Sequence, residues 1–252
     1  MAKTVRYEEL NTGDFLAAGF DKVIVPVGSC EAHGDHLPFG TDAMVAHDLA
    51  LSVAERVPGT MVLPPTWFGM SHHYRHKPMC VSLSHLTTIA LFGDILRSVV
   101  GWGFRKVLVI NGHDGNIPCL HVAAQELKLD HPEVGLALVD AWWTVGLSLL
   151  PKETWEAYAG YGHGGEAETS IALAMIPHLT DPGRARGMMD TKDPLIREVW
   201  NYQELTEEGA TGDGRAATAE KGQRMKAAIV DYVVAFLERK EREGWVIPRR
   251  EV

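Results

Sequence analysis

Short apolar runs alternate with amphipathic helical patterns along most of this chain. Strands are predicted where the runs are continuous and rich in Val, Ile and Leu, at residues 22–27, 60–65, 106–111 and 134–140. Such runs are typical of strands that are buried on both faces. Helices are predicted where apolar residues recur at helical spacing, at residues 43–57, 87–101, 116–130, 165–176 and 217–240. This alternation predicts a parallel sheet with helices on both of its faces.

Residues that favour helix starts precede the first three helical patterns. They are Thr41 with Asp42, Thr87 with Thr88, and Asn116. The composition does not change abruptly anywhere and no internal repeat is visible, so a single domain over residues 1–252 is predicted.

Two further segments have open interpretations. Residues 181–216 are rich in Gly and in charged residues, and they are predicted to form loops that act as a lid or as a subunit contact. Trp142 and Trp143 follow a predicted strand. Packing at a subunit contact is favoured for them over a role in the wall of a pocket.

Composition and charge exclude several classes of partner. The 252 residues carry a formal net charge of -9, which argues against nucleic acid or an anionic membrane surface as a partner. The three cysteines are far apart and form no CxxC pair, as expected for small buried residues in a reducing cytoplasm. No signal core is visible, and no run approaches the roughly 18 apolar residues of a membrane span. A cytoplasmic protein is predicted.

Three polar clusters stand out along the chain. Two of them directly follow predicted strands, and the third lies at the start of a predicted helix. In an open parallel sheet, ligands bind beyond the carboxyl ends of the strands. The stretch after the first strand, "GSCEAHGDHLPFGTD", contains Glu31, His33 and Asp42, and "NGHDGN" after the third strand contains His113. In "NGHDGN", Gly112 and Gly115 are expected to permit close approach of the backbone. A third stretch, "GYGHGGEAETS" (160–170), places two carboxylates near the start of a helix, Glu166 and Glu168.

Each cluster taken alone has a simpler explanation. Asp42 is a suitable helix cap, "NGH" is a suitable strand-to-helix turn, and the helix dipole favours carboxylates in a first turn. Taken together, the clusters would place two imidazoles and at least three carboxylates at one edge of the sheet. Nitrogen and oxygen ligands without thiolates suit zinc, manganese or iron in a catalytic site.

The other histidines are less informative. The stretch "SHHYRH" (71–76) follows the second predicted strand, so it either lines a pocket, with His73 and Tyr74 in contact with substrate, or forms a solvated loop. Five scattered histidines are interpreted as structural or surface groups: His47, His85, His121, His131 and His178.

Three motifs carry a resemblance to a known family. The stretch "PVGSCEAHGDHLPFGTD" resembles the pattern P-x-G-S-x-E-x-H-G-P-H-L-P-L-x-T-D of the creatininase family, "NGHDGN" resembles its N-G-H-G-G-N, and "HGGEAETS" resembles its H-A-G-E-x-E-T-S. The motifs span residues 26–170 in the family's order, and the first departs clearly only at Asp35. The resemblance implies a three-layer α/β/α fold with a mostly parallel central sheet, a two-metal hydrolytic centre and a homo-oligomer, commonly a hexamer.

The resemblance also assigns roles to matching positions. Glu31 and His113 would hold one metal, and Asp42 would bridge both metals. The second metal would be held by His33 and by a carboxylate of the third motif, for which Glu168 is preferred and Glu166 is the alternative. The implied ligand set is therefore Glu31, His33, Asp42, His113 and Glu168.

Further roles follow from the same motifs. His163 matches the family's active-site histidine, with Glu166 as its helper, and Ser71 matches a serine near the substrate. Asp114 stands where creatininase itself has a tyrosine that touches substrate, and Gly115 stands where it has a carboxylate ligand. Ala159 and the stretch "KPMCVSL" (77–83) also differ from the family's pattern, so creatinine is not expected to be the substrate. His36 is expected to fix the loop instead of binding metal.

The function expected from these residues is metal-dependent hydrolysis of a small-molecule substrate. Two divalent ions, zinc in preference to manganese or iron, would share a hydroxide that attacks the carbonyl of a cyclic amide or formamide and breaks a carbon–nitrogen bond. Three alternatives stay open: carbon–carbon hydrolysis of a cyclic polyol ketone, trimming of a peptide during cofactor maturation, and a non-catalytic metal-binding scaffold.

Overall fold

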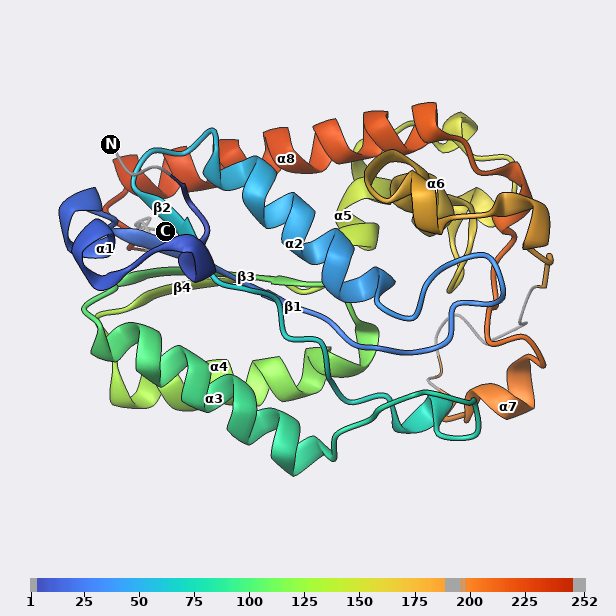
Figure 1. Cartoon of the computed structure of the whole chain (residues 1–252), viewed down its shortest axis with the longest axis horizontal. Helices are drawn as coiled ribbons and strands as arrows, with labels where there is room; N and C mark the ends of the chain where they lie inside the picture. The colour runs from blue at the N-terminus through green and yellow to red at the C-terminus, as the bar shows by residue number, and fades with distance from the viewer. Residues whose placement is uncertain (1–3, 189–195, 197, 247–252) are drawn as a thin grey trace, which may run out of the picture.

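A parallel sheet forms the centre of the protein. The structure, a computed structural model, describes residues 4–188, 196 and 198–246. Within these residues the sheet has four parallel strands in the order β2-β1-β3-β4 (Figure 1), with bounds β1 Lys22–Val27, β2 Thr60–Val62, β3 Lys106–Asn111 and β4 Gly135–Val139. The central strands are in register so that Val27 lies opposite Asn111. The segments that follow β1 and β3 therefore start side by side.

Helices cover both faces of this sheet, as Figure 1 shows. On one face lie α2 (Thr41–Ala54), α5 (Trp142–Leu149), α6 (Glu166–Met175) and α8 (Ala219–Arg242). On the other lie α3 (His85–Gly101) and α4 (Ile117–Asp130). Two shorter helices are α1 (Thr12–Ala18) and α7 (Tyr202–Leu205). This arrangement confirms the predicted three-layer α/β/α fold with a parallel central sheet.

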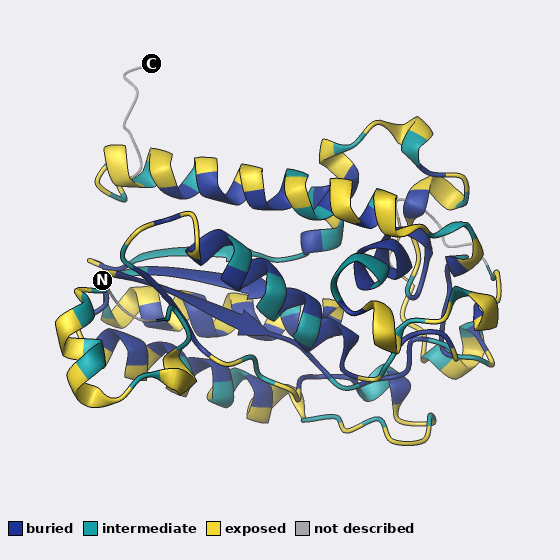
Figure 2. Cartoon of the chain, turned by 45° about the horizontal axis from the view of Figure 1, so that its top comes forward, coloured by how far each residue is buried: buried dark blue, intermediate teal, exposed yellow. Residues whose placement is uncertain are grey.

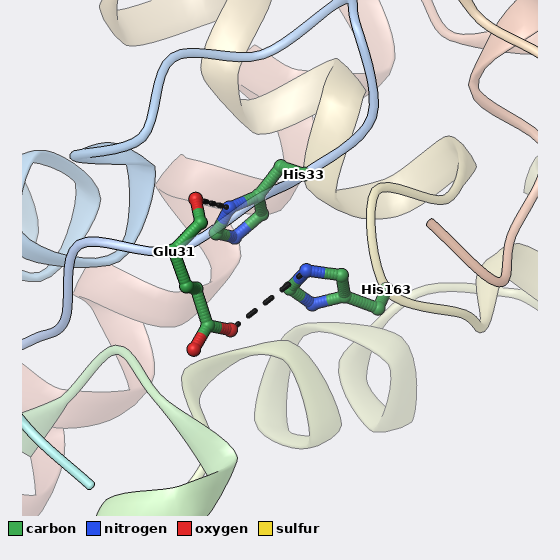
Figure 3. Close-up of side chains that lie close together, drawn as sticks. All are labelled: Glu31, His33 and His163. Atoms are coloured by element: carbon green, nitrogen blue, oxygen red, sulfur yellow. Dashed lines mark hydrogen bonds and ion pairs between the residues drawn. The ribbon is translucent and has the colours of Figure 1, made fainter. Parts of the chain in front are cut away.

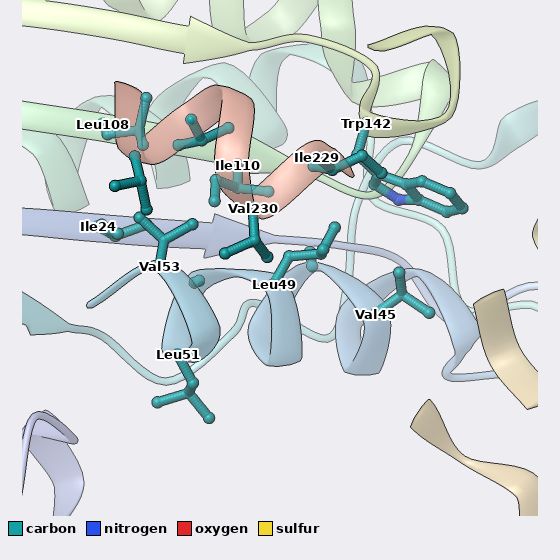
Figure 4. Packing of buried hydrophobic residues seen from close by; sticks show 14 of the residues in the cluster. Ile24, Val45, Leu49, Leu51, Val53, Leu108, Ile110, Trp142, Ile229 and Val230 are labelled. Atoms are coloured by element: carbon teal, nitrogen blue, oxygen red, sulfur yellow. The ribbon is translucent and has the colours of Figure 1, made fainter. Parts of the chain in front are cut away.

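Two apolar cores hold the layers together. On the α8 side, Ile24, Leu108 and Ile110 of the strands pack against Leu49 of α2 and Val230 of α8 (Figure 4). The second core lies on the α3 and α4 side and takes the alternate residues of the same strands. Because side chains alternate between the faces of a strand, a strand that is covered on both sides has to be apolar throughout. β1 and β2 are buried throughout and β3 is buried except at its first residue, whereas the edge strand β4 is only partly buried. Figure 2 shows this buried sheet and the exposed outer faces of the helices.

The predicted elements agree with the structure in kind and differ at their ends. β2 ends at Val62 instead of continuing to residue 65, because Pro64 and Pro65 have no backbone N–H to donate to the neighbouring strand. α3 begins earlier than predicted, with Ser84 as its N-cap accepting a hydrogen bond from the Thr87 N–H. Of the described helices, none combines the length and the apolar composition needed to cross a bilayer.

One prediction about the tryptophans was wrong. Trp142 was expected at a subunit contact, but its side chain is fully buried in the core of this chain, at the start of α5. α5 has only eight residues and is mostly apolar, so no amphipathic helical pattern is visible in the sequence here. Trp143 is partly buried and packs against the same core.

Candidate metal centre

The first two motifs meet because one glycine permits close contact. A Cβ atom at Gly112 would lie 2.1 Å from the backbone oxygen of Asp42, so only glycine fits between the loop after β3 and the first turn of α2. This contact brings His113 beside Asp42, which is the close approach predicted from the sequence. Asp42 does not cap α2, since the N-cap position is Gly40 and has no side-chain hydrogen bond. The cap interpretation of Asp42 is therefore wrong.

Asp42 lies between two histidines from different motifs. Its Oδ1 atom is 2.9 Å from His33 Nε2, and its Oδ2 atom is 3.2 Å from His113 Nδ1. Glu168 Oε1 lies 3.6 Å from the same nitrogen of His33, and Glu31 Oε1 lies 3.2 Å from the same nitrogen of His113. The structure thus brings together all five residues for which a ligand role was predicted, and each histidine faces two carboxylates.

Backbone carbonyls orient the imidazoles. His33 Nδ1 donates to the carbonyl of Glu31 (3.1 Å), and His113 Nε2 donates to the carbonyl of Met70 (2.9 Å). Figure 3 shows the first of these contacts. A hydrogen bond at one ring nitrogen orients the ring, so the other nitrogen faces the carboxylates, where a bound metal ion would take the place of its proton. This is how histidines are usually prepared for binding a metal.

Asparagines hold the second motif in place around His113. Asn111 accepts a hydrogen bond from the His113 N–H (3.1 Å) and donates one to the His113 carbonyl (2.6 Å). Asn116 donates to the carbonyl of Gly28 and accepts from the Met70 N–H, so it connects the loops that follow β1 and β2. Asn111 therefore fixes the backbone of His113, and Asn116 ties together the loops around it.

The electrostatics of the cluster suit a cation. Burial by itself lowers the pKa of His33 and of His113, but the adjacent carboxylates outweigh it and raise both pKa values well above the ordinary one. Burial raises the pKa of Glu168, but His33, His163 and the Gly164 N–H outweigh it and bring that pKa to about 2. Glu31 Oε2 is buried and accepts no hydrogen bond from the described residues. The buried carboxylates thus have unused ligand capacity, and the residues present fit divalent metal ions.

His163 lies at the edge of this cluster. Its Nε2 atom donates to the carbonyl of Ala32 (2.7 Å). The same atom is 3.8 Å from Glu31 Oε1, and Figure 3 shows this contact. Its ring centroid is 4.1 Å from that of His33. The pKa of His163 is lowered, mainly because the side chain is buried and also because the neighbouring His33 repels a second positive charge. The Nδ1 atom has no hydrogen bond within the described part of the chain and is 3.9 Å from Glu168 Oε2.

The structure does not bring Glu166 to the cluster. Its fully buried carboxylate accepts hydrogen bonds from the backbone N–H groups of Glu156 and Ala157 and forms an ion pair with Lys221 (2.6 Å). Glu168 instead faces His33. Of the two carboxylates that the sequence left open as ligands, Glu168 is therefore the one at the site, and the contacts of Glu166 provide no support for a helper role beside His163.

The predicted substrate residues are placed differently from one another. Ser71 is fully buried, and its hydroxyl contacts His113 Nε2 (3.2 Å) and the hydroxyl of Ser29 (2.5 Å). Tyr74 is also fully buried. Ser71 and Tyr74 are therefore covered by the protein and pack against histidines of the site, whereas Asp114 is exposed.

His73 lies nearer to the cluster than the sequence indicated. Its ring is stacked on that of His113, with centroids 5.6 Å apart and an interplanar angle of 10°. Burial lowers the pKa of His73 to about 4, so its ring is neutral at neutral pH. It also lines an open cavity of about 410 Å³ beside the cluster. The other lining residues are His72, Arg75, His76, Asn201 and Gln203.

Sequence reasoning missed Tyr202. This residue begins α7, inside the segment predicted to be a loop, and its ring stacks on Tyr74 at 4.1 Å and meets His163 edge-on at 5.5 Å. The only signal was an isolated aromatic residue in a polar segment. His36 behaves as predicted, because its Nε2 atom contacts the Gly164 carbonyl (2.9 Å) and the Thr169 hydroxyl (3.1 Å) and so fixes the loop before α6.

Comparison with known proteins identifies the family. The family model described as "Creatininase: Creatinine amidohydrolase" matches residues 8–237 of the chain. The chain belongs to the creatininase family. A solved structure of a creatininase-family protein, a putative creatinine amidohydrolase from Bacteroides fragilis, superposes with a TM-score of 0.84 at 28% identity and covers 100% of both chains.

Three relatives show the range of activities in the family. A mycofactocin precursor peptide peptidase from Mycolicibacterium smegmatis is 32% identical over 83% of this chain and 81% of its own length. A creatinine amidohydrolase from Pseudomonas putida is 29% identical over 73% and 76%. A 3-dehydro-scyllo-inosose hydrolase from Thermotoga maritima is 28% identical over 84% and 75%. This creatininase-family chain is therefore a metal-dependent hydrolase, and the comparisons do not favour a scaffold without activity.

Proposed function

We propose that this creatininase-family hydrolase cleaves a carbon–nitrogen bond in a cyclic amide or formamide with two divalent metal ions. The observation that carries the proposal is the position of Asp42, whose two carboxylate oxygens face different histidines, Oδ1 facing His33 and Oδ2 facing His113. A carboxylate in this position suits a bridge between two ions. Glu31 would complete one site and Glu168 the other.

The chemistry of the ligands supports zinc. Imidazole and carboxylate ligands without thiolate are typical of catalytic zinc sites, and they also accept manganese and iron. When bound, a pair of such ions lowers the pKa of a shared water and polarises the carbonyl of the substrate. The chain's own part is to hold these ions with the five buried side chains and to provide a neutral, oriented imidazole beside them.

His163 is the group proposed to move the proton. Its Nε2–H is committed to the carbonyl of Ala32, so Nδ1 is the atom that is available to accept and donate a proton. It would receive the proton released by the attacking water and pass it to the leaving nitrogen. Tyr202 and Tyr74 pack beside His163 and restrict its ring to this orientation. Glu166 takes no part in this step, because Lys221 occupies its carboxylate.

A carbon–nitrogen bond is preferred because two of the three relatives are named for such a reaction, a creatinine amidohydrolase and a peptide peptidase. The open cavity beside His73 is compatible with a cyclic small molecule or with the end of a peptide. The second candidate is carbon–carbon hydrolysis of a cyclic polyol ketone, which the name of the Thermotoga maritima relative favours. Both reactions need the same metal pair and differ in the leaving group.

The test is product analysis with metal-loaded protein. The purified protein would be stripped with chelator, reloaded with zinc or manganese, and assayed with matched panels of lactams, formamides, short peptides and cyclic ketones. Release of an amine with two bound ions per chain is the expected result. Turnover of only the cyclic ketones, without an amine, would favour the second candidate. A homo-oligomer and a cytoplasmic location stay predictions that size measurement and cell fractionation would test.

A further inference from the structure

His73 makes ring contacts with His113, Tyr74 and Tyr202, but it has no polar partner among the described residues. It lies in the short 3-10 turn His72–Tyr74, its ring is partly buried, and its side chain forms no hydrogen bond or ion pair in the part of the chain that the structure describes. The three histidines of the cluster described above each donate to a backbone carbonyl, and His73 does not. Both of its ring nitrogens are therefore uncommitted.

The surroundings of His73 are those of a ligand. Glu31, His73 and His113 each offer a ligand atom, and these atoms lie within 4.8 Å of one another. Ligands at about 2.0–2.2 Å from an ion lie up to roughly 4.2 Å apart when they are on opposite sides of it. In a tetrahedral site the ligand atoms lie roughly 3.3–3.6 Å apart, so side-chain rotations that bring the atoms closer by about 1 Å would place all three on one ion.

We propose that His73 is a further ligand of the metal ion held by Glu31 and His113. This inference rests on the two-metal function proposed above and adds a residue to one of its two sites. Without His73, that site has one carboxylate, one imidazole and a share of Asp42. A neutral imidazole from His73 would strengthen it without adding charge to a buried cluster that already contains three carboxylates.

Gly115 permits His73 to lie close to His113. A Cβ atom at this position would lie 2.6 Å from His113 Nε2 and 3.0 Å from His73 Cε1. Any side chain at residue 115 would therefore fill the space in which the two imidazoles approach each other. The same Cβ atom would lie 2.1 Å from the Met70 carbonyl, so glycine at this position is what permits the packing of the His73 and His113 rings.

The competing role for His73 is contact with the substrate, because it also lines the cavity of about 410 Å³. The two roles differ in what happens to metal binding. A ligand contributes to affinity for the ion in the absence of substrate, whereas a substrate contact changes only the binding of substrate.

The experiment measures metal affinity in three variants of the full chain. Metal-free wild type, His73→Ala, His73→Gln and His72→Ala would each be titrated with zinc in competition with a chelator, and with cobalt while the visible absorption is followed. His72 is the matched control, because it lies in the same turn and cavity but belongs to no metal-binding group among the described residues. Thermal unfolding of the metal-free variants would verify that they fold.

Loss of a residue that merely hydrogen-bonds to a metal ligand weakens metal binding by roughly 10- to 100-fold. In both His73 variants, the affinity for one of the two ions should fall by at least this factor. The cobalt spectrum of that site should change, and His72→Ala should match wild type. Wild-type affinity and spectrum in both His73 variants, with weaker substrate binding alone, would overturn the assignment.

The same titration of His113→Ala separates this inference from the proposed function. If wild type binds two ions and His113→Ala loses one while the His73 variants lose none, only the role of His73 is wrong. If wild type binds fewer than two ions, the two-metal function itself fails.

Discussion

Lys221 Nζ lies 2.6 Å from Glu166 Oε1, and this ion pair joins the first turn of α8 to the first turn of α6. Glu166 also accepts hydrogen bonds from two backbone N–H groups of the loop before His163. One carboxylate of the third motif thus anchors the loop that presents His163, while the other, Glu168, faces His33. The two carboxylates have separate tasks although only one residue lies between them.

Glu166→Gln should lower stability and leave metal binding intact. Breaking a fully buried ion pair costs about 3–5 kcal/mol, and the loss here should be smaller because Lys221 keeps its contacts with Glu156 and with the Ala216 carbonyl. Urea unfolding of the metal-loaded protein would measure the loss, and elemental analysis would measure the bound metal. Loss of a metal ion with unchanged stability would instead make Glu166 a ligand.

Glu156→Gln is the matched control for that variant. Glu156 also pairs with Lys221, at 2.7 Å, but its side chain is 72% exposed. Exposed ion pairs contribute about 0–1 kcal/mol, so this substitution should change the free energy of unfolding very little.

Asp42→Asn should reduce the binding of both metal ions. Because Asp42 faces His33 with one oxygen and His113 with the other, removal of its charge weakens both proposed sites at once. Elemental analysis after dialysis should show well under two ions per chain. Asp114→Asn, a change at an exposed carboxylate near the same cluster, should keep the wild-type metal content. If Asp42→Asn lost only one ion, the bridging role would be wrong.

His163→Gln should lose turnover and retain the metal ions. General acid–base groups contribute typically about 10²- to 10⁴-fold to rate, and glutamine occupies a similar volume without being able to exchange a proton at neutral pH. Measured kcat with the best substrate of the panel should fall by that factor while the metal content stays at the wild-type value. His76→Gln, at an exposed histidine of the cavity, is the control. Joint loss of metal and activity would show that His163 is a ligand.

Metal loading should release protons and should be weaker at lower pH. In the metal-free protein the carboxylates outweigh burial and raise the pKa values of His33 and His113 well above the ordinary value, which favours the protonated form of both rings. A metal ion has to displace these protons, so its apparent affinity increases as the pH rises. Calorimetric titration with zinc in buffers of different ionisation enthalpy would count the released protons. Affinity that is independent of pH between 6 and 8 would contradict the raised pKa values.

Much of the fold follows from the sequence alone. The apolar runs identify all four described strands, because a strand covered on both faces has to be apolar, and the polar segments after β1 and β3 identify the functional edge of the sheet. α1, α5 and α7 were not predicted. They have seven, eight and four residues, which is too short for a helical repeat of apolar positions to be recognised.

The chain by itself determined which residue types gather at the carboxyl edge of the sheet, but only the tertiary structure decided their roles. Asp42 is suitable for a cap, and its binding partners are visible only when β1 and β3 lie in register and Gly112 lets their loops touch. Glu166 and Glu168 are two residues apart in a helix, so they point to different sides, and the packing of α6 between α2 and α8 decides which one faces His33. Local pattern determines what a segment can form, and contacts between distant segments determine what each side chain does.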